Sequence, residues 1–211
     1  MEVKEETIEL TGESVGIDLG IKDLAICSNK EEPYKNINKT KRVRKQEKKL
    51  RRLQCKISRK YEKNKEGRSY VKTSNIIKLE KRIRKTHKRL DNIRTDYRHK
   101  VTTEIVKTKP SRVVMEDLNI SGMMKNKHLS KAIAQQGLYE FKSMMKYKCE
   151  KYGINFIEAD KWYPSSKTCS ECGYIKTKLA LSERKFECEC CGAVIDRDKN
   201  ASINLSRYKA S

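Results

Sequence analysis

Two pairs of cysteines in the last quarter of the sequence have the spacing of a metal site. Cys169 and Cys172 form one Cys-x-x-Cys pair, and Cys188 and Cys191 form a second pair after fifteen intervening residues. Each such turn can present two sulfur atoms to one ion, and two turns complete the tetrahedron of a structural zinc site. We therefore expect the four thiolates to hold one Zn²⁺. Because no coordination position is left open, we expect its role to be structural.

The second pair is ambiguous, because Cys190 could compete with Cys191 as a ligand. Glycine follows both Cys172 and Cys191, and glycine suits the tight backbone of such a turn. Pairing Cys188 with Cys191 therefore reproduces the register of the first pair. The remaining cysteines are isolated, and we expect ordinary thiols at Cys27, Cys55 and Cys149.

Three acidic side chains could serve a second kind of metal site. Asp18 lies in the apolar segment VGIDLG and Glu116 in RVVMEDL, while a third acid, Asp196 or Asp198, follows the second cysteine pair. Charged groups are rarely placed within apolar strands without a partner. Phosphodiester hydrolysis can use two divalent ions about 3.5–4 Å apart, and magnesium prefers oxygen ligands. Together the acids fit that demand, although each one alone could be a turn residue or a helix cap.

The elements that must position these residues follow from apolar patterning. Short apolar segments predict strands within 8–19, at 24–27 and at 33–38, arranged as an antiparallel meander. Further buried strands are predicted at 112–118 and 154–160, and helices at 131–152 and from about 198 to 208. Because strands and helices alternate along the chain, we predict a mixed α/β sheet.

Residues 40–106 have a different pattern, which predicts a long helical hairpin. Gly67 and Ser69 lie in a polar connector, and Pro110 ends the second helix. The first helix would bury Val43, Leu50, Leu53 and Ile57, and the second would bury Ile76, Leu79, Ile83, Leu90, Ile93, Tyr97, Val101 and Ile105. The hairpin is interpreted either as a plain coiled-coil strut or, as we favour, as a strut that also holds phosphates.

The charge balance indicates a polyanionic partner. Lys and Arg total 50 against 28 Asp and Glu, for a net charge of +22. Residues 40–72 alone carry 15 basic and 3 acidic side chains. Nucleic acid is the partner we expect, with an anionic membrane surface as the alternative. No apolar run approaches the roughly 18 residues of a membrane span and no secretory signal is visible, so we expect a cytoplasmic protein with reduced thiols.

Four segments together resemble a known nuclease architecture. VGIDLG, VVMEDLN, the paired cysteines and DRDKNASINL resemble the three segments of a RuvC-type, RNase H-like nuclease domain with an inserted zinc ribbon. This arrangement resembles the TnpB family of transposon-encoded, RNA-guided nucleases, from about Glu9 to Arg207. The resemblance implies a nuclease core formed by residues 1–162 and 193–211 and a zinc ribbon insertion at 163–192.

The resemblance also assigns the acids. It implies that Asp18, Glu116 and Asp198 hold catalytic Mg²⁺, since Asp198 begins the D-x-N motif of the family. Asp196 would then be a turn or cap residue, with a ligand role as its alternative. Asp117 is expected to point to the other face of the strand.

The resemblance implies a metal-dependent DNA endonuclease whose partners are DNA and a guide RNA. Members usually carry an N-terminal half that helps to bind the guide and open the target, and Met1 lies only 17 residues before Asp18. We therefore expect an N-terminally truncated member, and a separate subunit could supply the missing half. The alternative is a non-catalytic nucleic-acid-binding fragment or regulator. Trp162 and Tyr163 are expected to support the zinc ribbon, with base stacking as the alternative.

Overall fold

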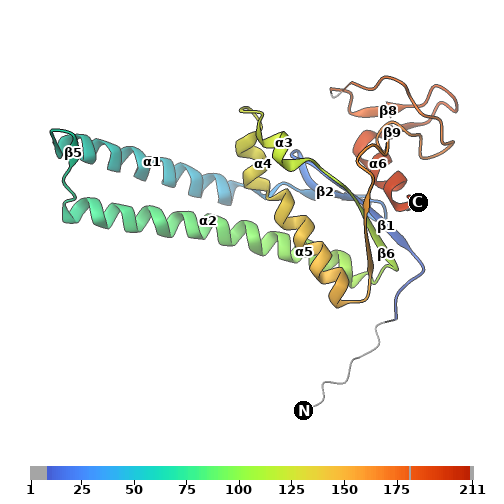
Figure 1. Ribbon diagram of the computed structural model, residues 1–211, viewed down its shortest axis with the longest axis horizontal. Coiled ribbons are helices and arrows are strands. Elements are labelled where there is room, and N and C mark those ends of the chain that lie inside the picture. The colour runs from blue at the N-terminus through green and yellow to red at the C-terminus, as the bar shows by residue number, and fades with distance from the viewer. Residues whose placement is uncertain (1–8, 181, 210–211) are drawn as a thin grey trace, which may run out of the picture. The chain divides into compact units, whose positions relative to one another are not determined.

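The computed structural model describes residues 9–180 and 182–209 (Figure 1). The predicted strand region starts at Ile8, and the predicted nuclease core includes residues 1–8 and 210–211. These residues lie outside the described part of the chain. The chain divides into two compact units, one formed by residues 1–36 and 98–211 and the other by residues 37–97.

The larger unit contains one five-stranded sheet. Its strands are β1 (Ser14–Leu19), β2 (Asp23–Cys27), β3 (Tyr34–Lys35), β6 (Arg112–Glu116) and β7 (Asn155–Ala159). They lie in the order β3-β2-β1-β6-β7, with β1–β2 and β2–β3 antiparallel and β1–β6 and β6–β7 parallel. The predicted mixed α/β sheet and its antiparallel meander are confirmed.

The third predicted strand is much shorter than expected. Only Tyr34 and Lys35 pair with β2, and Ile37–Lys39 form a 3-10 turn, η1. The Asn36 side-chain amide donates a hydrogen bond to the Ile21 carbonyl oxygen at 2.7 Å. Because the 3-10 turn begins directly after Asn36, the prediction of a strand to residue 38 is wrong.

Helix α6 (Arg197–Ser206) covers one face of the sheet and packs closely against β1. A β-carbon added at Gly16 would lie 2.0 Å from the Ser202 carbonyl oxygen and 2.4 Å from the Ser206 amide nitrogen. Val114, Ala159 and Leu205 form the buried cluster beneath the helix. The predicted C-terminal helix is confirmed. Its backbone lies so close to β1 that there is no room for a β-carbon at position 16.

A second helical layer contains α5 (Leu138–Lys151), which buries Phe141, Met145 and Cys149. It is joined to the end of α2 (Ser74–Lys107), where the Lys148 ammonium donates to the His99 carbonyl oxygen and to the hydroxyls of Thr102 and Thr103, each at 2.7 Å. Figure 1 shows α5 and α6 on opposite sides of the strands β1 and β6.

The single helix predicted at 131–152 is wrong, because the segment forms two helices. Helix α4 (Ser130–Gln136) ends at Gly137, whose φ of 67° is left-handed, and α5 begins at the next residue. A side chain at Gly137 would press on Arg98, which forms an ion pair with Glu140. A further short helix, α3 (Ile120–Met124), was not expected from the sequence.

The smaller unit is the predicted helical hairpin. Helix α1 (Lys41–Lys63) begins after Thr40, whose side chain accepts a hydrogen bond from the Val43 amide. The connector forms a minimal hairpin of β4 (Lys65–Glu66) and β5 (Ser69–Tyr70), with Gly67 at a left-handed φ of 59°. Helix α2 follows and ends three residues before Pro110, as predicted.

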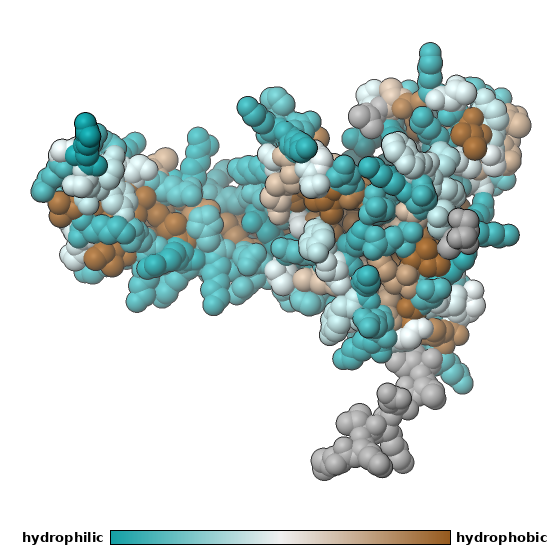
Figure 2. Space-filling model, viewed as in Figure 1, coloured by the Kyte–Doolittle hydropathy of each residue, from teal (hydrophilic) through white to brown (hydrophobic). Residues whose placement is uncertain are grey.

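The apolar stripe predicted for the hairpin is confirmed. Its members are buried or half-buried along α2, and Val43, Leu90 and Ile93 form a buried cluster with Ile37 and Leu50 packed against it. Hydrophilic side chains cover most of the visible surface of α1 and α2 (Figure 2). The pair of helices is therefore held by a narrow apolar seam beneath a polar exterior.

Replacing Gly16 with Ala is expected to destabilise the protein by at least about 3 kcal/mol, the upper part of the range for overpacking a core. The new methyl group would meet backbone atoms of α6, which cannot rotate away as a side chain can. Urea unfolding followed by circular dichroism measures the change.

Gly12→Ala is the matched control, because no atom lies within 4 Å of a β-carbon at Gly12. Its free energy of unfolding should change by less than about 1 kcal/mol. Equal effects of the two substitutions would contradict the close approach of α6 to β1.

Candidate functional site

Two of the predicted acids lie on neighbouring parallel strands and face the same way. Gly16 of β1 pairs with Val114 of β6, and Asp18 and Glu116 each follow two residues later. Because side chains alternate along a strand, both acids project to the face on which Gly16 and Val114 meet α6. Asp198 lies in the first turn of α6, above that face. The fold thus brings Asp18, Glu116 and Asp198 to one end of the sheet.

Asp18 is close enough to the other two carboxyl groups for their charges to act on it. Burial raises the pKa of Asp18 well above its ordinary value, and the charges of Asp198 and Glu116 raise it further. Burial also raises the pKa of Glu116 and of Asp198. The Arg197 guanidinium lowers all three pKa values and so offsets part of this repulsion.

In the part of the chain that the structure describes, the carboxylates of Asp18 and Glu116 have no hydrogen bond or ion pair. Asp198 has one distant cation, with 4.0 Å between its Oδ2 and Nη1 of Arg184. Half-buried carboxylates without partners are costly unless a cation joins them. The donor set therefore fits a divalent ion of the magnesium type, which prefers oxygen ligands.

Asp196 has a different position from Asp198. Its Oδ1 accepts hydrogen bonds from the backbone amides of Asp198 and Lys199, each at 3.1 Å, and it is the N-cap of α6. A cap of this kind satisfies amides that the helix leaves unpaired. The prediction that Asp196 is a turn or cap residue is confirmed.

Lys199 fixes the start of α6 against the meander. Its ammonium donates to the carbonyl oxygens of Cys27, Ser28 and Lys30 at 2.9, 2.8 and 2.8 Å. These three bonds use every proton of the ammonium group. Sequence reasoning missed this role, since the three acceptors are backbone atoms about 170 residues away.

The four predicted cysteines come together in a second cluster. Their Sγ atoms all lie within 4.8 Å of one another, with 3.7 Å between Cys169 and Cys191 and 3.5 Å between Cys172 and Cys188. Four sulfurs around a zinc ion at about 2.3 Å would lie roughly 3.8 Å apart, so the cluster fits a tetrahedral ion. Among the described residues, the three carboxylates do not form so tight a group.

The two cysteine turns have the same backbone pattern, as the glycine register predicts. Gly173 and Gly192 have left-handed φ angles of 77° and 73°, and their amides donate to the carbonyl oxygens of Cys169 and Cys188. A hydrogen bond from the Cys191 amide lowers the pKa of Cys188 to about 6, which favours the thiolate. Cys190 is exposed and lies outside the cluster.

Helix α6 is bonded directly to the segment that carries the first cysteine pair. The Asn200 side chain accepts from the Ser170 amide at 2.9 Å and donates to the Thr168 carbonyl oxygen at 2.6 Å. One turn later, Asn204 donates to the carbonyl oxygens of Ser165 and Thr168. Both asparagines are buried, so the helix that carries Asp198 also holds the cysteine segment in place.

The second cysteine pair is joined to α6 by the chain itself. β8 (Lys185–Glu187) and β9 (Val194–Asp196) form an antiparallel hairpin around the pair and lead into the helix. The Arg197 guanidinium donates to the carbonyl oxygens of Ala180 and Glu183 at 2.9 and 3.4 Å. The residue that moderates the charge of the acids therefore also contacts the cysteine segment.

The aromatic residues before the cysteines have separate environments. Tyr163 packs on the cluster beneath α6 and forms an edge-to-face pair with Tyr208, at 4.9 Å between ring centroids. Trp162 is 83% exposed. The predicted supporting role is therefore wrong for Trp162, and Tyr163 packs on the core beneath α6 instead of the apolar cluster around Cys169 and Cys188.

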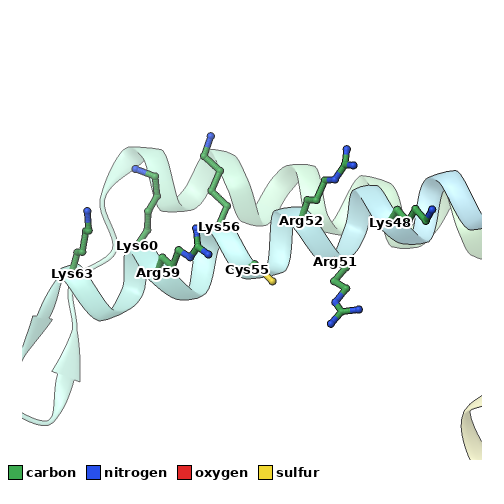
Figure 3. Close-up of a pocket in the computed structure, with 8 residues that line it drawn as sticks. All are labelled: Lys48, Arg51, Arg52, Cys55, Lys56, Arg59, Lys60 and Lys63. Carbon is green, nitrogen blue, oxygen red and sulfur yellow. The ribbon is translucent and has the colours of Figure 1, made fainter.

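A basic groove of about 730 Å³ lies along α1 in the smaller unit. Figure 3 shows its side chains extending from successive turns of the helix. Among the described residues, none of the basic members has an ion-pair partner. The groove is lined by Lys48, Arg51, Arg52, Cys55, Lys56, Arg59, Lys60 and Lys63.

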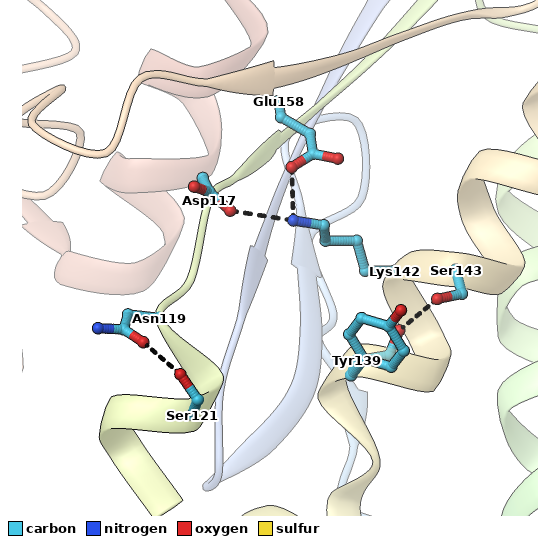
Figure 4. A network of polar contacts seen from close by, with 7 residues as sticks. All are labelled: Asp117, Asn119, Ser121, Tyr139, Lys142, Ser143 and Glu158. Carbon is cyan, nitrogen blue, oxygen red and sulfur yellow. Dashed lines mark hydrogen bonds and ion pairs between the residues drawn. The ribbon is translucent and has the colours of Figure 1, made fainter.

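Asp117 forms an ion pair with a lysine of α5. The Lys142 ammonium, which extends from α5, lies 3.0 Å from Asp117 Oδ1 and 2.5 Å from Glu158 Oε2 (Figure 4). Glu158 pairs with Met115 in the sheet, and Met115 faces away from α6. Asp117 therefore bonds on the opposite side of the sheet from the three acids.

Two family models match the chain. A model described as "Probable transposase" matches residues 1–127, and one described as "Cas12f1-like, TNB domain" matches residues 139–205. The first covers more than half of the sequence and contains Asp18 and Glu116. The second contains the four cysteines and Asp198.

Curated relatives agree with these models. A protein of Streptomyces pristinaespiralis named "Putative RNA-guided DNA endonuclease" is 36% identical over 92% of this chain and 45% of its own length. The protein InsQ of Escherichia coli K12, named in the same terms, is 33% identical over 90% of this chain and 48% of its own length. The chain thus spans about half the length of the curated relatives it matches.

Solved structures share the fold. A Cas12f1–sgRNA–target DNA complex matches with a TM-score of 0.61 and 21% identity over 94% of this chain and 51% of the other. A CRISPR–Cas12f ternary complex matches with a TM-score of 0.65 and 22% identity over 97% of this chain and 40% of the other.

In the described part of the present chain, none of the helices is both long and apolar enough to cross a membrane.

Asp18→Asn is expected to stabilise the protein near neutral pH in buffer without magnesium. Because the pKa of Asp18 is raised by folding, the folded state binds more protons than the unfolded state between the ordinary and the raised pKa. The free energy of unfolding therefore falls as the pH rises through that window. Above the raised pKa, the ionised carboxylate of Asp18 destabilises the folded state by its full amount. Asparagine removes the charge, so the variant should melt at a higher temperature than the wild-type chain.

The advantage of the variant should shrink as the pH falls toward about 4 and vanish below it, because the carboxyl group then becomes protonated in the unfolded state as well. Asp91→Asn, at an exposed position of α2, is the control and should show no such pH-dependent gain. A melting temperature for Asp18→Asn at or below that of the wild-type chain near neutral pH would contradict the electrostatic description of the site.

Proposed function

The chain belongs to the TnpB family, and on that premise we propose that it carries the catalytic centre of a transposon-associated, RNA-guided DNA endonuclease. The observation that carries the proposal is the convergence of Asp18, Glu116 and Asp198 from two parallel strands and one helix. The names of the relatives support the activity, and the shared fold with complexes of guide RNA and target DNA supports the partners. Guide RNA and target DNA are therefore the ligands we propose.

The architecture we propose is that of a RuvC-type, RNase H-like core with a zinc ribbon insertion. The sheet and α6 would form the core, with the cysteine segment at 163–192 inserted between β7 and α6. The order of the acids along the chain and the mixed sheet support this assignment. The domain limits at 162 and 193 stay a prediction.

We propose that Asp18, Glu116 and Asp198 hold divalent metal, of which Mg²⁺ is the best match to carboxylate oxygens. When bound, such ions activate water and stabilise the charge that develops on a phosphodiester. Arg197 moderates the repulsion between the acids, and Lys199 and the Asp196 cap fix the helix turn that carries Asp198. These residues keep the ligands in position before the ions arrive.

We propose a structural Zn²⁺ at Cys169, Cys172, Cys188 and Cys191. The four sulfur donors and their separations fit zinc, and all four positions of the tetrahedron are protein ligands, so no position is left for substrate. Because Asn200 and Asn204 bond the cysteine segment to α6, the ion would stabilise the helix that presents Asp198. Its contribution to cleavage would be indirect.

We propose that the basic groove of α1 holds a nucleic acid strand through its phosphates. Its seven Lys and Arg side chains have no ion-pair partner among the described residues (Figure 3), so an external anion would reduce their mutual repulsion. Contacts of lysine and arginine with phosphates fix position without reading sequence. Guide RNA or target DNA could occupy the groove in this way.

Asp18→Ala should abolish magnesium-dependent cleavage of DNA by the chain with its bound guide RNA. Loss of a ligand that contacts the ion should cost more than about 100-fold in rate, the upper end of the cost of losing a supporting residue. Cleavage of a labelled plasmid that carries the guide-matched target measures the effect.

Glu150→Ala removes an exposed acid of α5 and is the control, which should cut at the wild-type rate. Both variants should keep the zinc content and the circular dichroism of the wild-type chain. Cleavage that survives in folded Asp18→Ala would exclude Asp18 as a metal ligand. Guide-bound wild-type chain that does not cut under any magnesium concentration would favour a non-catalytic nucleic-acid-binding protein.

Cys172→Ser should lower the bound zinc well below one ion per chain, whereas Cys190→Ser should keep one. Both cysteines are exposed, but only Cys172 belongs to the sulfur cluster. Plasma mass spectrometry of the purified proteins gives the zinc content. Cys172→Ser should also cut DNA more slowly, although its three acids are intact. A zinc loss of equal size in both variants would show that the ligand set is wrong.

A further inference from the structure

The only tryptophan of the sequence is held on a fixed turn with its ring in solvent. The Trp162 amide donates to Asp160 Oδ1 at 2.7 Å, and the Asp160 amide donates to the Tyr208 hydroxyl at 3.1 Å. The next residue is anchored as well, because the Tyr163 hydroxyl donates to the Asn204 carbonyl oxygen at 3.0 Å. The backbone on both sides is thus bonded to the core, while the indole remains 83% exposed.

A polar cavity of about 490 Å³ lies beside this turn. Its lining includes Asn119 and Ser121 after β6, Tyr139 and Lys142 of α5, and Lys161, whose ammonium lies 5.5 Å from the centroid of the Trp162 ring. Tyr139 is 67% exposed. The cavity therefore has an exposed aromatic ring in its wall and a second one at its border.

The cavity lies at the same edge of the sheet as the acids. Glu116 is the last residue of β6 and pairs with Ala159, the last residue of β7. The segments that continue from these two strands provide the lining residues 117–121 and 161. Ligands of open α/β sheets bind outside the carboxyl ends of the strands, which is this edge.

The two lysines that line the cavity, Lys142 and Lys161, have different partners. Lys142 is neutralised by Asp117 and Glu158, as Figure 4 shows, so it sets the shape of the cavity without attracting an anion. Lys161 has no carboxylate partner among the described residues and lies beside the indole. One free cation and two exposed rings suit a ligand that has both a phosphate backbone and flat bases.

We propose that the cavity and Trp162 bind single-stranded nucleic acid, with bases stacked on Trp162 and Tyr139 and a phosphate beside Lys161. Unpaired bases present free π faces to aromatic rings, whereas the bases of a duplex stack on one another. This inference rests on the proposed function and deepens it, because the cavity lining begins at Asp117, directly after Glu116 at the end of β6, so a strand bound here would lie at the edge of the sheet that carries the acids. Trp162, Tyr139 and Lys161 would hold the strand that the acids cut.

The fluorescence of Trp162 tests the proposal directly, because it is the only tryptophan in the chain. Without magnesium, so that no strand is cut, a thymidine oligonucleotide should quench the emission of Trp162. An abasic oligonucleotide of equal length, which has phosphates but no bases, should bind without quenching. A uridine oligonucleotide tests RNA in the same way, so quenching by the thymidine strand, the uridine strand or both shows whether the site binds DNA, RNA or either. A thymidine–adenine duplex, whose bases are already stacked, should quench the emission least.

Substitutions separate stacking from general charge attraction. Trp162→Ala and Tyr139→Ala should weaken binding of a labelled thymidine oligonucleotide roughly 5- to 150-fold, the range for loss of one stacked base. The measurement is made at salt high enough to weaken the purely electrostatic contacts. Trp162→Phe and Tyr139→Phe should restore most of the affinity. Tyr147→Ala is the matched control on α5, since Tyr147 is 55% exposed but does not line the cavity.

Binding of the thymidine oligonucleotide without quenching, equal quenching by the abasic strand, or unchanged affinity in both alanine variants would overturn the inference. These results differ from a failure of the proposed function. Quenching by the thymidine strand in a chain that never cuts DNA would support the binding site and contradict the nuclease. Asp18-dependent cleavage with unchanged binding in Trp162→Ala and Tyr139→Ala would support the nuclease and contradict the site.

Discussion

Helix α6 passes so close to β1 that a single methyl group at Gly16 would collide with its backbone. The arrangement of the acids depends on this approach, because Asp18 follows Gly16 by two residues and Asp198 lies in the first turn of the helix. A larger separation would place a layer of side chains between the carboxylates. The parallel pairing of β1 with β6 then adds Glu116 at the same level. The tight packing of α6 on β1 at Gly16 therefore sets the positions of Asp18 and Asp198.

Such an arrangement has an electrostatic cost, and the chain distributes the compensation among several groups. The charges of Asp198 and Glu116 oppose the ionisation of Asp18, and burial adds to the free energy needed to ionise all three acids. Arg197 offsets part of that repulsion, and the positive end of α6 favours an acid in its first turn. The three bonds of Lys199 and the buried amides of Asn200 and Asn204 prevent the helix from moving away. Local hydrogen bonding holds together a group of charges that would otherwise separate.

The sequence predicts most of this site because its signals are local. An acid inside an apolar strand, as at Asp18 and Glu116, is unusual enough to be noticed without coordinates, and the glycine register identifies the correct cysteines. Gly137 carries a weaker signal, since a glycine inside an apolar pattern can also continue a helix, and its left-handed backbone depends on packing against Arg98. The roles of Lys199 and Asn200 could not be predicted, because their partners are backbone atoms distant in sequence. Exposure of Trp162 likewise depends on how the turn is anchored.

The distribution of the acids along the chain also has a consequence for protein synthesis. Asp198 is synthesised 180 residues after Asp18, and domains tend to fold from the N-terminal side as the chain emerges from the ribosome. β1 and β2 can pair at once, but β1 must wait for β6, and its outer face must wait for α6. A nascent chain therefore carries the first acid for many seconds without its partners. The growing polypeptide has no complete set of carboxylates until α6 has been synthesised, so the proposed metal site would form only after that helix has left the ribosome.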